Sequence, residues 1–516
     1  MEITKIYTKE LRFRINLPVR EVSWGMLMSI SEIIKMLEAG LGKDKVHSLD
    51  FERFVYGTDW SPRTPDEIVP PDVVVTPKTT EDVVKVVKIA YETNTPVTCG
   101  GGLTGMAGGA VPIHKGIFLD MTSMNRIIEI DVENQTVRVQ AGATLQEVND
   151  ALEKHGLWLT NLPESKWSCT VGSSIALEND STFGMRWGRI NQALTSVQIV
   201  TGTGEVLELG HRKSHHTSSG YKLKDLIISS EGTLGVITEA TLKVEPLPEY
   251  RTVDMILFPS LKTAVNYVNR LLKAGLQIEA AHCNCKRRLN FYASTYKEKY
   301  GKAPQIPDWA NALLGISFSG NRDFVEFERS YAMKIAESEE FKGQILKERE
   351  IVDSWWTSKY TLLFEAFKQK WPNTQKEKKF AAADVGVPMG RLEDIYKKFV
   401  EISEKHGLEI LGMNAYFENP NSIGFSLSCA VYVDYRSKKE VEAFRKFHED
   451  MSKAAVDLEG TMSTYMSDTY LKVPYFEYEQ GKSAEYMKKI KLLFDPKGIM
   501  NPGKKFARSS LKEVVQ

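Results

Sequence analysis

The chain has 516 residues, of which 67 are basic and 67 acidic, so its formal net charge is zero. Because binding DNA or RNA requires an excess of cations to neutralise phosphates, nucleic acid is not expected as the main partner. Hydrophobic residues make up 42% and charged residues 26% of the chain, as in ordinary globular proteins, and the length suffices for two or more domains.

The sequence gives no indication of membrane insertion or export. No stretch approaches the roughly 18–20 apolar residues that span a bilayer, and the charged N-terminus lacks the apolar core of a signal peptide. The five cysteines are odd in number and include no C-x-x-C pair, which fits a reduced compartment. We therefore expect a cytoplasmic protein, which a partner could hold peripherally on a membrane.

The first part of the chain predicts two helices and then a glycine-rich loop. One helix is expected over 29–40 and a second over 81–90, with Thr80 as its N-cap. A short strand over 96–98 leads into CGGGLTGMAGGA, residues 99–110, which contains six glycines. Since glycine adopts positive φ and has no side chain, such a loop lets backbone N–H groups approach a phosphate. The loop matches neither a Rossmann nor a Walker motif.

Strands and glycine turns follow in a regular order. Strands are predicted over 116–121, 124–131 and 136–140, and a helix begins after Thr144 with Glu147 in a capping box. Three further segments complete the pattern, namely CTVGSSIALENDSTFGMRWG at 169–188, SVQIVTGTGEVLELG at 196–210 and SSEGTLGVITEATLKVEPLP at 229–248.

This order of segments resembles the FAD-binding domain of the vanillyl-alcohol-oxidase superfamily and, within it, the D-lactate dehydrogenase and glycolate oxidase flavoprotein group. The resemblance covers about residues 45–250, and the block FDPKGIMNPGK at 494–504 matches the C-terminal signature of the family. It implies an α+β protein in which a PCMH-type FAD-binding domain of two subdomains carries an α+β cap domain with an antiparallel sheet.

Four parts of the chain are expected. They are an N-terminal arm and helix at 1–44, the FAD-binding domain at 45–250, the cap or substrate domain at 251–460, and a C-terminal segment at 461–516 that packs on the FAD-binding domain. Pro-Leu-Pro at 246–248 predicts the linker, since proline breaks regular structure. In the cap, strands are predicted over 252–258, 381–387 and 423–433. Helices over 261–275 and 392–406 are expected to cover one face of its sheet.

The resemblance implies one noncovalently bound FAD. Relatives that tether the flavin through the first loop have a histidine there, whereas this chain has Leu103 and Thr104. The first loop would bind the pyrophosphate, residues 168–174 would pass along the ring and ribityl chain, and residues 232–237 would approach the adenine. The expected FAD contacts are Cys99, Gly100, Gly101, Gly102, Leu103, Thr104, Gly105, Met106, Pro163, Ser168, Cys169, Thr170, Gly172, Ser173, Ser174, Ala176, Gly232, Gly235, Val236, Ile237 and Asn501.

Several family motifs are altered in this chain. Three glycines of the family pattern are replaced in the second loop, by Ser173, Asp180 and Ser181. The stretch 411–417 lacks the histidines of the family's His-x-Gly-Asp-Gly-Asn-x-His metal motif, and Met466 stands where the family has a histidine as general base. Alternation on a strand explains Cys283 and Cys285 more simply than a metal does. We therefore expect no metal, and the family's proton transfer does not apply unchanged.

Other residues are candidates for the missing base. Tyr465, Asp468 and Tyr470 could deprotonate or orient a hydroxyl if they lie near the flavin, and the alternative is that they are ordinary surface or core residues of a loop. His216, in the only histidine pair of the chain, is a further candidate, with a solvated polar loop as the alternative.

An anionic substrate would also need a positive anchor. Lys359 stands about where the family has an arginine that holds the substrate carboxylate, and Arg287 or Arg288 are alternatives. Without the family histidine and metal, D-lactate is expected to be a poor substrate. Aromatic residues favour a larger or more apolar molecule, or else form the core of the cap; they are Trp355, Trp356, Trp371, Tyr416, Tyr465, Tyr470 and Tyr475.

The expected function is that of an FAD-dependent oxidoreductase. It would oxidise an alcohol or hydroxy acid by hydride transfer to flavin N5 and pass electrons to a protein or quinone. The alternative is a flavin-carrying electron-transfer subunit of a larger redox complex, with an altered or lost hydroxy-acid site. Because the chain has no four-cysteine iron–sulfur motif, both functions need a separate acceptor, such as an iron–sulfur or electron-transfer subunit. A homodimer or a hetero-complex would fit.

Overall fold

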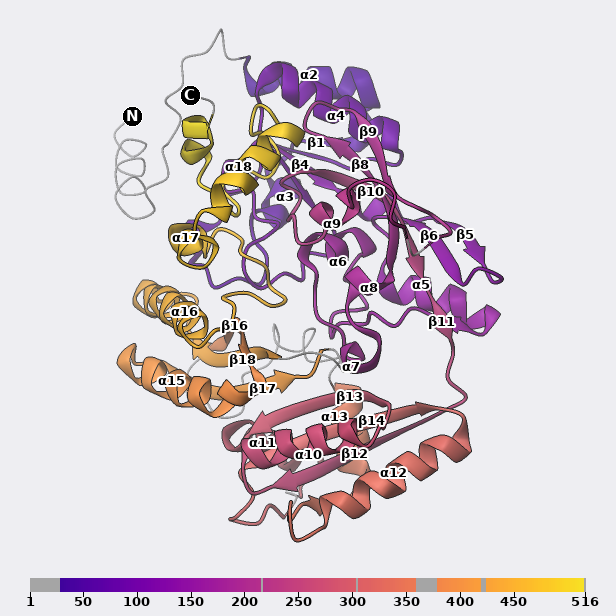
Figure 1. The fold of residues 1–516 in the computed structure, drawn as a ribbon. Coiled ribbons are helices and arrows are strands. Elements are labelled where there is room, and N and C mark those ends of the chain that lie inside the picture. Colours follow the sequence, from indigo (N-terminus) through magenta and orange to yellow (C-terminus); the bar gives the residue numbers. More distant parts are fainter. Residues whose placement is uncertain (1–27, 215–216, 303–304, 359–377, 419–423, 515–516) are drawn as a thin grey trace.

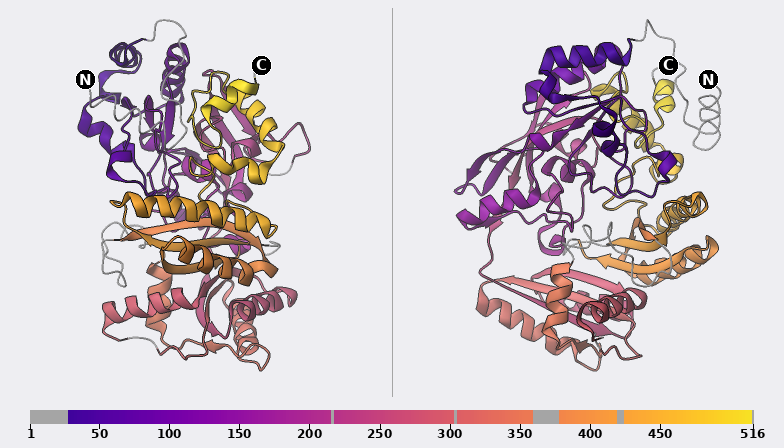
Figure 2. Two further views of the ribbon diagram at one scale, coloured as in Figure 1. Left: turned by 90° about the vertical axis from the view of Figure 1, so that its left-hand side faces the viewer. Right: turned by 180° about the vertical axis from the view of Figure 1, so that it is seen from behind.

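The computed structural model forms two lobes, which Figure 1 and Figure 2 show one above the other. In the first lobe, the N-terminal half of the chain is joined by the C-terminal segment, and the cap lobe is formed by the stretch between them. The α+β class expected from the sequence is confirmed. The structure describes residues 28–214, 217–302, 305–358, 378–418 and 424–514.

The first subdomain of the first lobe is a four-stranded sheet with the order β1-β2-β4-β3. Its strands are β1 (Val46–His47), β2 (Val73–Val75), β3 (Val97–Gly100) and β4 (Ile117–Asp120). Helices α2 (Ile30–Leu41) and α4 (Thr80–Thr93) bury apolar faces against this sheet, and α3 (Asp50–Phe54) lies between β1 and β2 in the chain. The hydroxyl of Thr79 accepts the N–H of Asp82. The N-cap is therefore Thr79, one residue earlier than predicted.

The second subdomain is a five-stranded antiparallel sheet with the order β5-β6-β10-β8-β9. Its strands are β5 (Ile127–Asp131), β6 (Thr136–Gln140), β8 (Leu194–Thr201), β9 (Val206–Gly210) and β10 (Gly235–Lys243). The short helices are α5 (Leu145–Leu152), α6 (Val171–Leu177), α7 (Gly184–Trp187), α8 (Ile190–Ala193) and α9 (Leu223–Ile227). The capping box predicted for Thr144 and Glu147 is confirmed at the start of α5.

The cap lobe contains a seven-stranded antiparallel sheet with the order β15-β12-β14-β13-β17-β18-β16. Its strands are β12 (Tyr250–Phe258), β13 (Ile278–Cys285), β14 (Ala312–Gly320), β15 (Gln344–Ile345), β16 (Lys379–Pro388), β17 (Glu409–Tyr416) and β18 (Gly424–Val433). Four helices share one hydrophobic cluster with the sheet, namely α10 (Leu261–Lys273), α12 (Arg322–Ala336), α15 (Leu392–Lys405) and α16 (Lys438–Asp457).

Helices cover both faces of the cap sheet, and the prediction of helices on one face alone is wrong. Residues of α11 (Lys286–Tyr300) and α13 (Arg349–Ser358) pack with Met255 and Leu257 of β12, whereas Ile256 points to the opposite cluster. The physical reason is that successive residues of these strands are both apolar, so each face of the sheet needs a cover.

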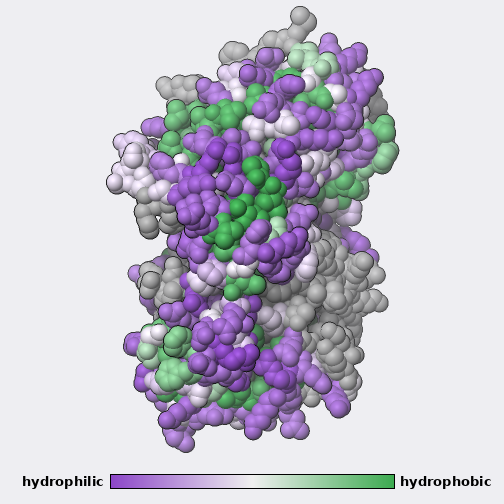
Figure 3. Space-filling view, turned by 90° about the vertical axis from the view of Figure 1, so that its right-hand side faces the viewer, coloured by the Kyte–Doolittle hydropathy of each residue, from purple (hydrophilic) through white to green (hydrophobic). Residues whose placement is uncertain are grey.

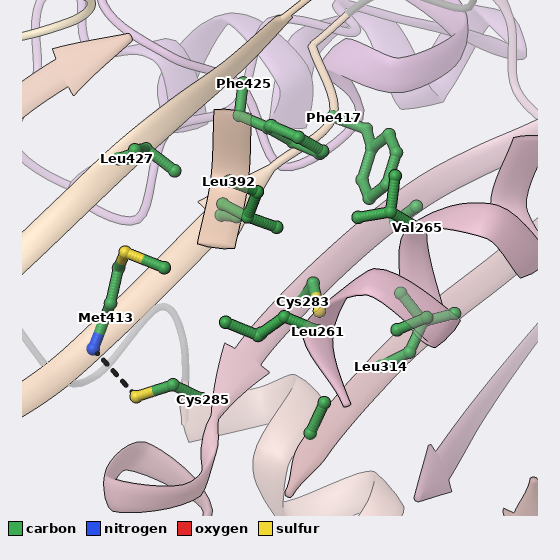
Figure 4. Packing of buried hydrophobic residues seen from close by; sticks show 14 of the residues in the cluster. Leu261, Val265, Cys283, Cys285, Leu314, Leu392, Met413, Phe417, Phe425 and Leu427 are labelled. Carbon is green, nitrogen blue, oxygen red and sulfur yellow. Dashed lines mark hydrogen bonds between the residues drawn. The ribbon is translucent and has the colours of Figure 1, made fainter. Parts of the chain in front are cut away.

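Figure 4 shows the core between the cap sheet and its first layer of helices. Cys283 and Cys285 point into this core beside Leu261, Leu314 and Met413. The Cys285 sulfur accepts a hydrogen bond from the backbone N–H of Met413 at 3.2 Å. Both cysteines therefore act as packing side chains of a buried strand.

The two crossings between the lobes differ. The predicted linker begins inside a two-residue strand, β11 (Glu245–Pro246), which pairs with β7 (Leu157–Trp158), and proline is tolerated in such an edge strand. After α16 the chain returns to the first lobe through α17 (Phe476–Gln480) and α18 (Ser483–Phe494). There the N–H of Val97 donates to the Ile499 carbonyl at 2.8 Å, so the C-terminal segment extends the edge of the first sheet at β3.

The surface seen in Figure 3 is mostly hydrophilic, with apolar areas interspersed on both lobes. No helix in the described part of the chain is both long and apolar enough to cross a membrane.

Candidate functional site

The glycine loop follows β3 directly and is packed against a second segment, residues 168–174. A methyl group on Gly101 would overlap the hydroxyl of Thr170, and one on Gly102 would overlap the Ser168 carbonyl. Only glycine fits such a close approach. The second segment was predicted as a loop, but Thr170 caps α6, so residues from Val171 onward are helical. The glycines of the first loop therefore allow the two segments to pack closely together, beside a cavity that both segments line.

Two hollows of about 180 and 70 Å³ lie along this loop. Both are lined by Gly101, Gly109, Ala110, Ser173 and Leu177, so they form one elongated cavity. The larger hollow lies between the glycine loop and the cap strands, and the smaller one reaches β10. An elongated cavity that runs along a glycine-rich loop suits a dinucleotide.

Most of the predicted FAD contacts line this cavity. They are Cys99, Gly100, Gly101, Leu103, Thr104, Gly105, Met106, Pro163, Cys169, Thr170, Gly172, Ser173, Ala176, Gly232, Gly235, Val236 and Ile237. Residues that the prediction of FAD contacts omitted also line it, among them Trp60, Glu164, Asn179 and Glu231.

Four predicted FAD contacts lie behind the cavity wall. Gly102 and Ser168 are at the contact between the two segments, and the Ser174 hydroxyl is hydrogen-bonded to the side-chain oxygens of Asn161 and Asn179. The remaining one, Asn501, supports the loop from outside.

The side chain of Asn501 joins the C-terminal segment to the glycine loop. Its amide nitrogen donates to the Gly109 carbonyl at 3.0 Å and to the Glu231 carbonyl at 2.7 Å. Both of these residues line the cavity. Asn501 therefore holds two parts of the cavity wall together.

Lys504 lies buried beneath the same loop. Its ammonium group donates to the carbonyls of Gly108 at 2.6 Å and Val111 at 2.9 Å. Burial, and then the positive charge of Arg63, lower the pKa of Lys504 to about 7. The sequence placed Lys504 in the C-terminal signature but offered no reason to expect it under the glycine loop.

Arg288 provides a buried cation on the cap side of the cavity. It lies on α11, is 5% exposed and lines the larger hollow. Its Nε is 3.4 Å from the Tyr292 hydroxyl, but Nη1 has no hydrogen-bond partner among the described residues. A buried guanidinium nitrogen without an acceptor is costly, so this end of the cavity favours an anion. The exposed neighbour Arg287 does not line the cavity.

Two phenols lie on the cap side. The Tyr416 hydroxyl accepts a hydrogen bond from the Asn414 amide at 3.2 Å and lies 3.4 Å from a Glu164 carboxylate oxygen. Burial, and then the charge of Glu164, raise the pKa of Tyr416 well above its usual value. Burial, and then the charge of Asp384, raise the pKa of Tyr465 in the same way. Both phenols therefore keep their protons near neutral pH.

The predicted catalytic residues have different locations. Tyr465 lines the larger hollow beside Met466. Asp468 does not line the cavity, and its carboxylate forms an ion pair with Lys505 at 2.7 Å. His216 and Lys359 lie outside the described residues.

The expected aromatic lining is only partly present. Tyr416 and Tyr465 line the cavity, whereas Tyr475 contacts His448 at 2.9 Å and Trp356 packs on Phe183. The ring of Tyr470 stacks on Arg63 beneath the loop. The side chain of Trp355 and all of Trp371 lie outside the part of the chain that the structure describes. Other aromatic residues complete the wall, namely Trp60, Phe380 and Tyr435.

No described residues form a group of three or more His, Cys, Asp or Glu side chains that could hold a metal ion. The stretch 411–417 belongs mainly to β17 and contributes Tyr416 to the cavity.

Comparisons with known proteins agree with this geometry. The FAD binding domain matches residues 71–210, and the C-terminal domain of FAD linked oxidases matches residues 247–505. Glycolate oxidase subunit GlcD of Bacillus subtilis is 28% identical over 464 residues, 90% of this chain and 94% of that protein. D-lactate dehydrogenase of Archaeoglobus fulgidus is 29% identical over 442 residues, 84% of this chain and 90% of that protein.

Solved structures show the same fold. A 4-ethylphenol oxidase from Gulosibacter chungangensis has a TM-score of 0.75 at 15% identity and covers 93% of this chain and 98% of its own. p-Cresol methylhydroxylase also has a TM-score of 0.75, at 15% identity, covering 93% of this chain and 97% of its own. An alkyldihydroxyacetonephosphate synthase has a TM-score of 0.70 at 21% identity, covering 94% and 87%.

Proposed function

The chain belongs to the family of FAD-linked oxidases, and on this premise we propose that it oxidises a hydroxy acid whose carboxylate binds Arg288. The observation that carries the proposal is the Nη1 atom of Arg288 in the wall of the cavity, for which the described residues offer no hydrogen-bond partner. A carboxylate supplies two acceptor oxygens that match a guanidinium, and such charge-assisted hydrogen bonds are strong. Glycolate and lactate, which appear in the names of the relatives, are both hydroxy acids.

FAD is the cofactor, and the residues of the elongated cavity fit it. The main chain around Gly101 would bind the pyrophosphate, Gly235 and Val236 would border the adenine, and Ser173 lies at the junction of the hollows. When bound, FAD accepts a hydride equivalent from the carbon that carries the hydroxyl. The glycine loop contains no histidine to which the flavin could be attached, which supports noncovalent binding.

Tyr416 and Glu164 are proposed to take the hydroxyl proton. Because the pKa of Tyr416 is raised, its phenol accepts this proton only as it donates its own to the Glu164 carboxylate 3.4 Å away. Tyr465, on the same wall, is proposed to orient the hydroxyl. The substrate body would contact Phe380 and Tyr435, which favours a molecule larger than lactate.

The electrons are proposed to pass to a separate acceptor, a redox protein or a quinone. One relative is named as a subunit, and another from Saccharomyces cerevisiae, 27% identical over 84% of this chain, is named as a cytochrome-linked D-lactate dehydrogenase. A cytoplasmic location, with a partner that holds the protein on a membrane surface, is consistent with such an acceptor. The function of an electron-transfer subunit without its own substrate remains the second candidate, because Met466 replaces the histidine expected from the family resemblance.

Anaerobic reduction of the purified yellow protein tests the proposal. Hydroxy acids should bleach the visible flavin band, whereas the matching alcohols without a carboxylate should not. Acid precipitation should release the flavin into the supernatant. Bleaching by neutral alcohols alone would contradict the role of Arg288. Reduction by dithionite or a redox partner, but by no hydroxy acid, would instead support the electron-transfer subunit.

A further inference from the structure

A fully buried ion pair lies behind the cap side of the cavity. Asp384 of β16 and Lys472 are both 0% exposed, and the Lys472 ammonium is 2.9 Å from an Asp384 oxygen. Lys472 also donates to the Ser467 carbonyl at 3.1 Å. Neither residue lines the cavity, so neither contacts substrate or cofactor directly.

The second oxygen of Asp384 organises the turn of residues 463–467. It accepts the backbone N–H groups of Thr464 at 3.0 Å, Tyr465 at 3.1 Å and Met466 at 2.8 Å. The Ser463 hydroxyl adds a hydrogen bond at 3.3 Å. Consecutive N–H groups that converge on one point form a nest, which binds an anion. In this protein the anion is the Asp384 carboxylate, which lies 79–82 residues before the turn in the sequence.

The same turn carries part of the cavity wall. Tyr465 and Met466, whose N–H groups bind Asp384, both line the larger hollow. The turn is also tied to the first lobe, because the Ser467 hydroxyl donates to the Leu177 carbonyl at 2.9 Å. Arg189 of the first lobe is hydrogen-bonded to the Thr464 carbonyl. The position of the turn therefore sets the distance between the cap wall and α6.

Stability alone does not account for the pair. Two charges removed from water pay a desolvation cost that a well-packed apolar pair avoids, so a buried ion pair is weak evidence of stabilisation. Burial raises the pKa of Asp384, but Lys472 and the hydrogen bonds outweigh it and bring the pKa below its usual value. The carboxylate is thus ionised, as an acceptor for several N–H groups requires.

We infer that Asp384, kept ionised by Lys472, is a positioning residue that places Tyr465 and Met466 against the substrate. The inference rests on the proposed function where it assigns a substrate to the cavity. The geometry of the turn does not depend on that function. Removing the charge should let the turn move while the rest of the cap stays folded, because the Thr461 and Gly386 backbones pair independently of it.

The test compares Asp384→Asn, Lys472→Met and the double variant, each purified with bound FAD. Asp384→Asn leaves a buried ammonium without its partner and should lower the melting temperature strongly. The double variant removes both charges and should recover most of that loss. Asp254→Asn is the matched control, because Asp254 is another buried cap-strand carboxylate, paired with Arg329 at 2.7 Å, and lies outside the cavity.

Hydrogen exchange of the 461–468 peptide, which needs no substrate, is the first measurement. In the double variant its amides should exchange about tenfold faster or more, since hydrogen bonds to a charged acceptor are lost. In Asp254→Asn they should exchange as in the wild type. Unchanged exchange in the stable double variant would overturn the inference, whatever the substrate is.

Flavin reduction is the second measurement. The double variant should retain full FAD content and reduce it about tenfold or more slowly with the best hydroxy acid, despite its recovered melting temperature. Recovery of the wild-type rate together with stability would show that the pair is only structural. Should Asp384→Asn fail to fold, Asp384→Glu is the substitute variant, because it keeps the charge but shifts the carboxylate that accepts the N–H groups of the turn. The same hydrogen-exchange and flavin-reduction measurements are then made on Asp384→Glu. If no hydroxy acid reduces even the wild type, the proposed function fails while the exchange result still stands.

Discussion

On the first-lobe side the cavity follows the glycine loop, and on the cap side it is lined by long charged and aromatic side chains. A Cβ on Gly101 would overlap the Thr170 side chain and one on Gly235 would overlap the Val200 backbone, whereas Arg288 and Tyr416 bring functional groups from two separate elements. Substitutions should therefore act in opposite ways. On the first-lobe side, a larger side chain at a glycine should prevent FAD from binding. On the cap side, a shortened side chain should alter the reaction with substrate while FAD remains bound.

The largest effect is expected for Gly101→Val. Its side chain would overlap the hydroxyls of Thr170 and Ser173 and fill the space beside the loop, so FAD binding should be abolished. The measurement is the flavin-to-protein absorbance ratio after purification. Gly390→Ala is the control, because a Cβ there meets no atom within 4 Å, and it should keep its FAD. Stoichiometric FAD in Gly101→Val would contradict a cofactor site beside the glycine loop.

Arg288→Gln should separate substrate from cofactor. Losing a buried charge partner costs about 2–5 kcal/mol, so kcat/KM for hydroxy acids should fall by about 30-fold or more, with FAD content unchanged. The exposed neighbour Arg287→Gln is the control and should differ little from the wild type. Steady-state assays with an artificial acceptor measure both. An equal loss in the two variants would mean that Arg288 has no special contact.

Asn501→Ala should weaken FAD binding without abolishing it. The variant loses the hydrogen bonds to the Gly109 and Glu231 carbonyls, which are worth about 1–2 kcal/mol together, so the Kd of FAD should rise about five- to thirtyfold. Titration of the apoprotein with FAD gives this value. The exposed Asn290→Ala should leave the Kd as it is. A wild-type Kd in Asn501→Ala would show that the loop keeps its shape without this support.

The last effect, on the free energy of unfolding and not on cofactor or substrate binding, is expected from the titration of Lys504. In the folded protein the pKa of Lys504 is lowered to about 7 by burial, from the ordinary lysine value of 10.5 that applies to the unfolded chain. At a pH between these two pKa values, the unfolded state binds more protons than the folded state, so the free energy of unfolding rises with pH. The gain between pH 7 and 9 should be about 1–3 kcal/mol.

Urea unfolding at both pH values measures that gain. In Lys504→Met this part of the pH dependence should disappear. A wild-type slope in the variant would assign the effect to another group.

Much of the first-lobe side could be predicted, because its signals are local. The capping box of Thr144 and Glu147, the strand before the glycines and the glycine loop itself depend on residues within a few positions of one another. The prediction erred in the position of two helix starts. Thr170 starts a helix inside the expected second loop, and Thr79 rather than Thr80 caps α4.

The cap side was less predictable, because its members come from β16, β17, β18, α11 and the 463–467 turn. Tyr465 was predicted and lies in the wall, but Asp468, three residues later, pairs with Lys505 outside the cavity. Arg287 and Arg288 were equal alternatives in the sequence. Since neighbouring residues on a helix point about 100° apart, only the packing of α11 decides that Arg288 faces the cavity.

The sequence by itself determined the family, the cofactor and the glycine loop, since glycines, caps and strand alternation act over short distances along the chain. Only the tertiary structure decided which charged groups face the substrate. Asp384 and the N–H groups of Thr464, Tyr465 and Met466 lie about eighty residues apart, and no local pattern links a carboxylate to amides at that distance. Such pairings form in the folded chain because a buried charge or a buried N–H group without a hydrogen-bond partner costs free energy.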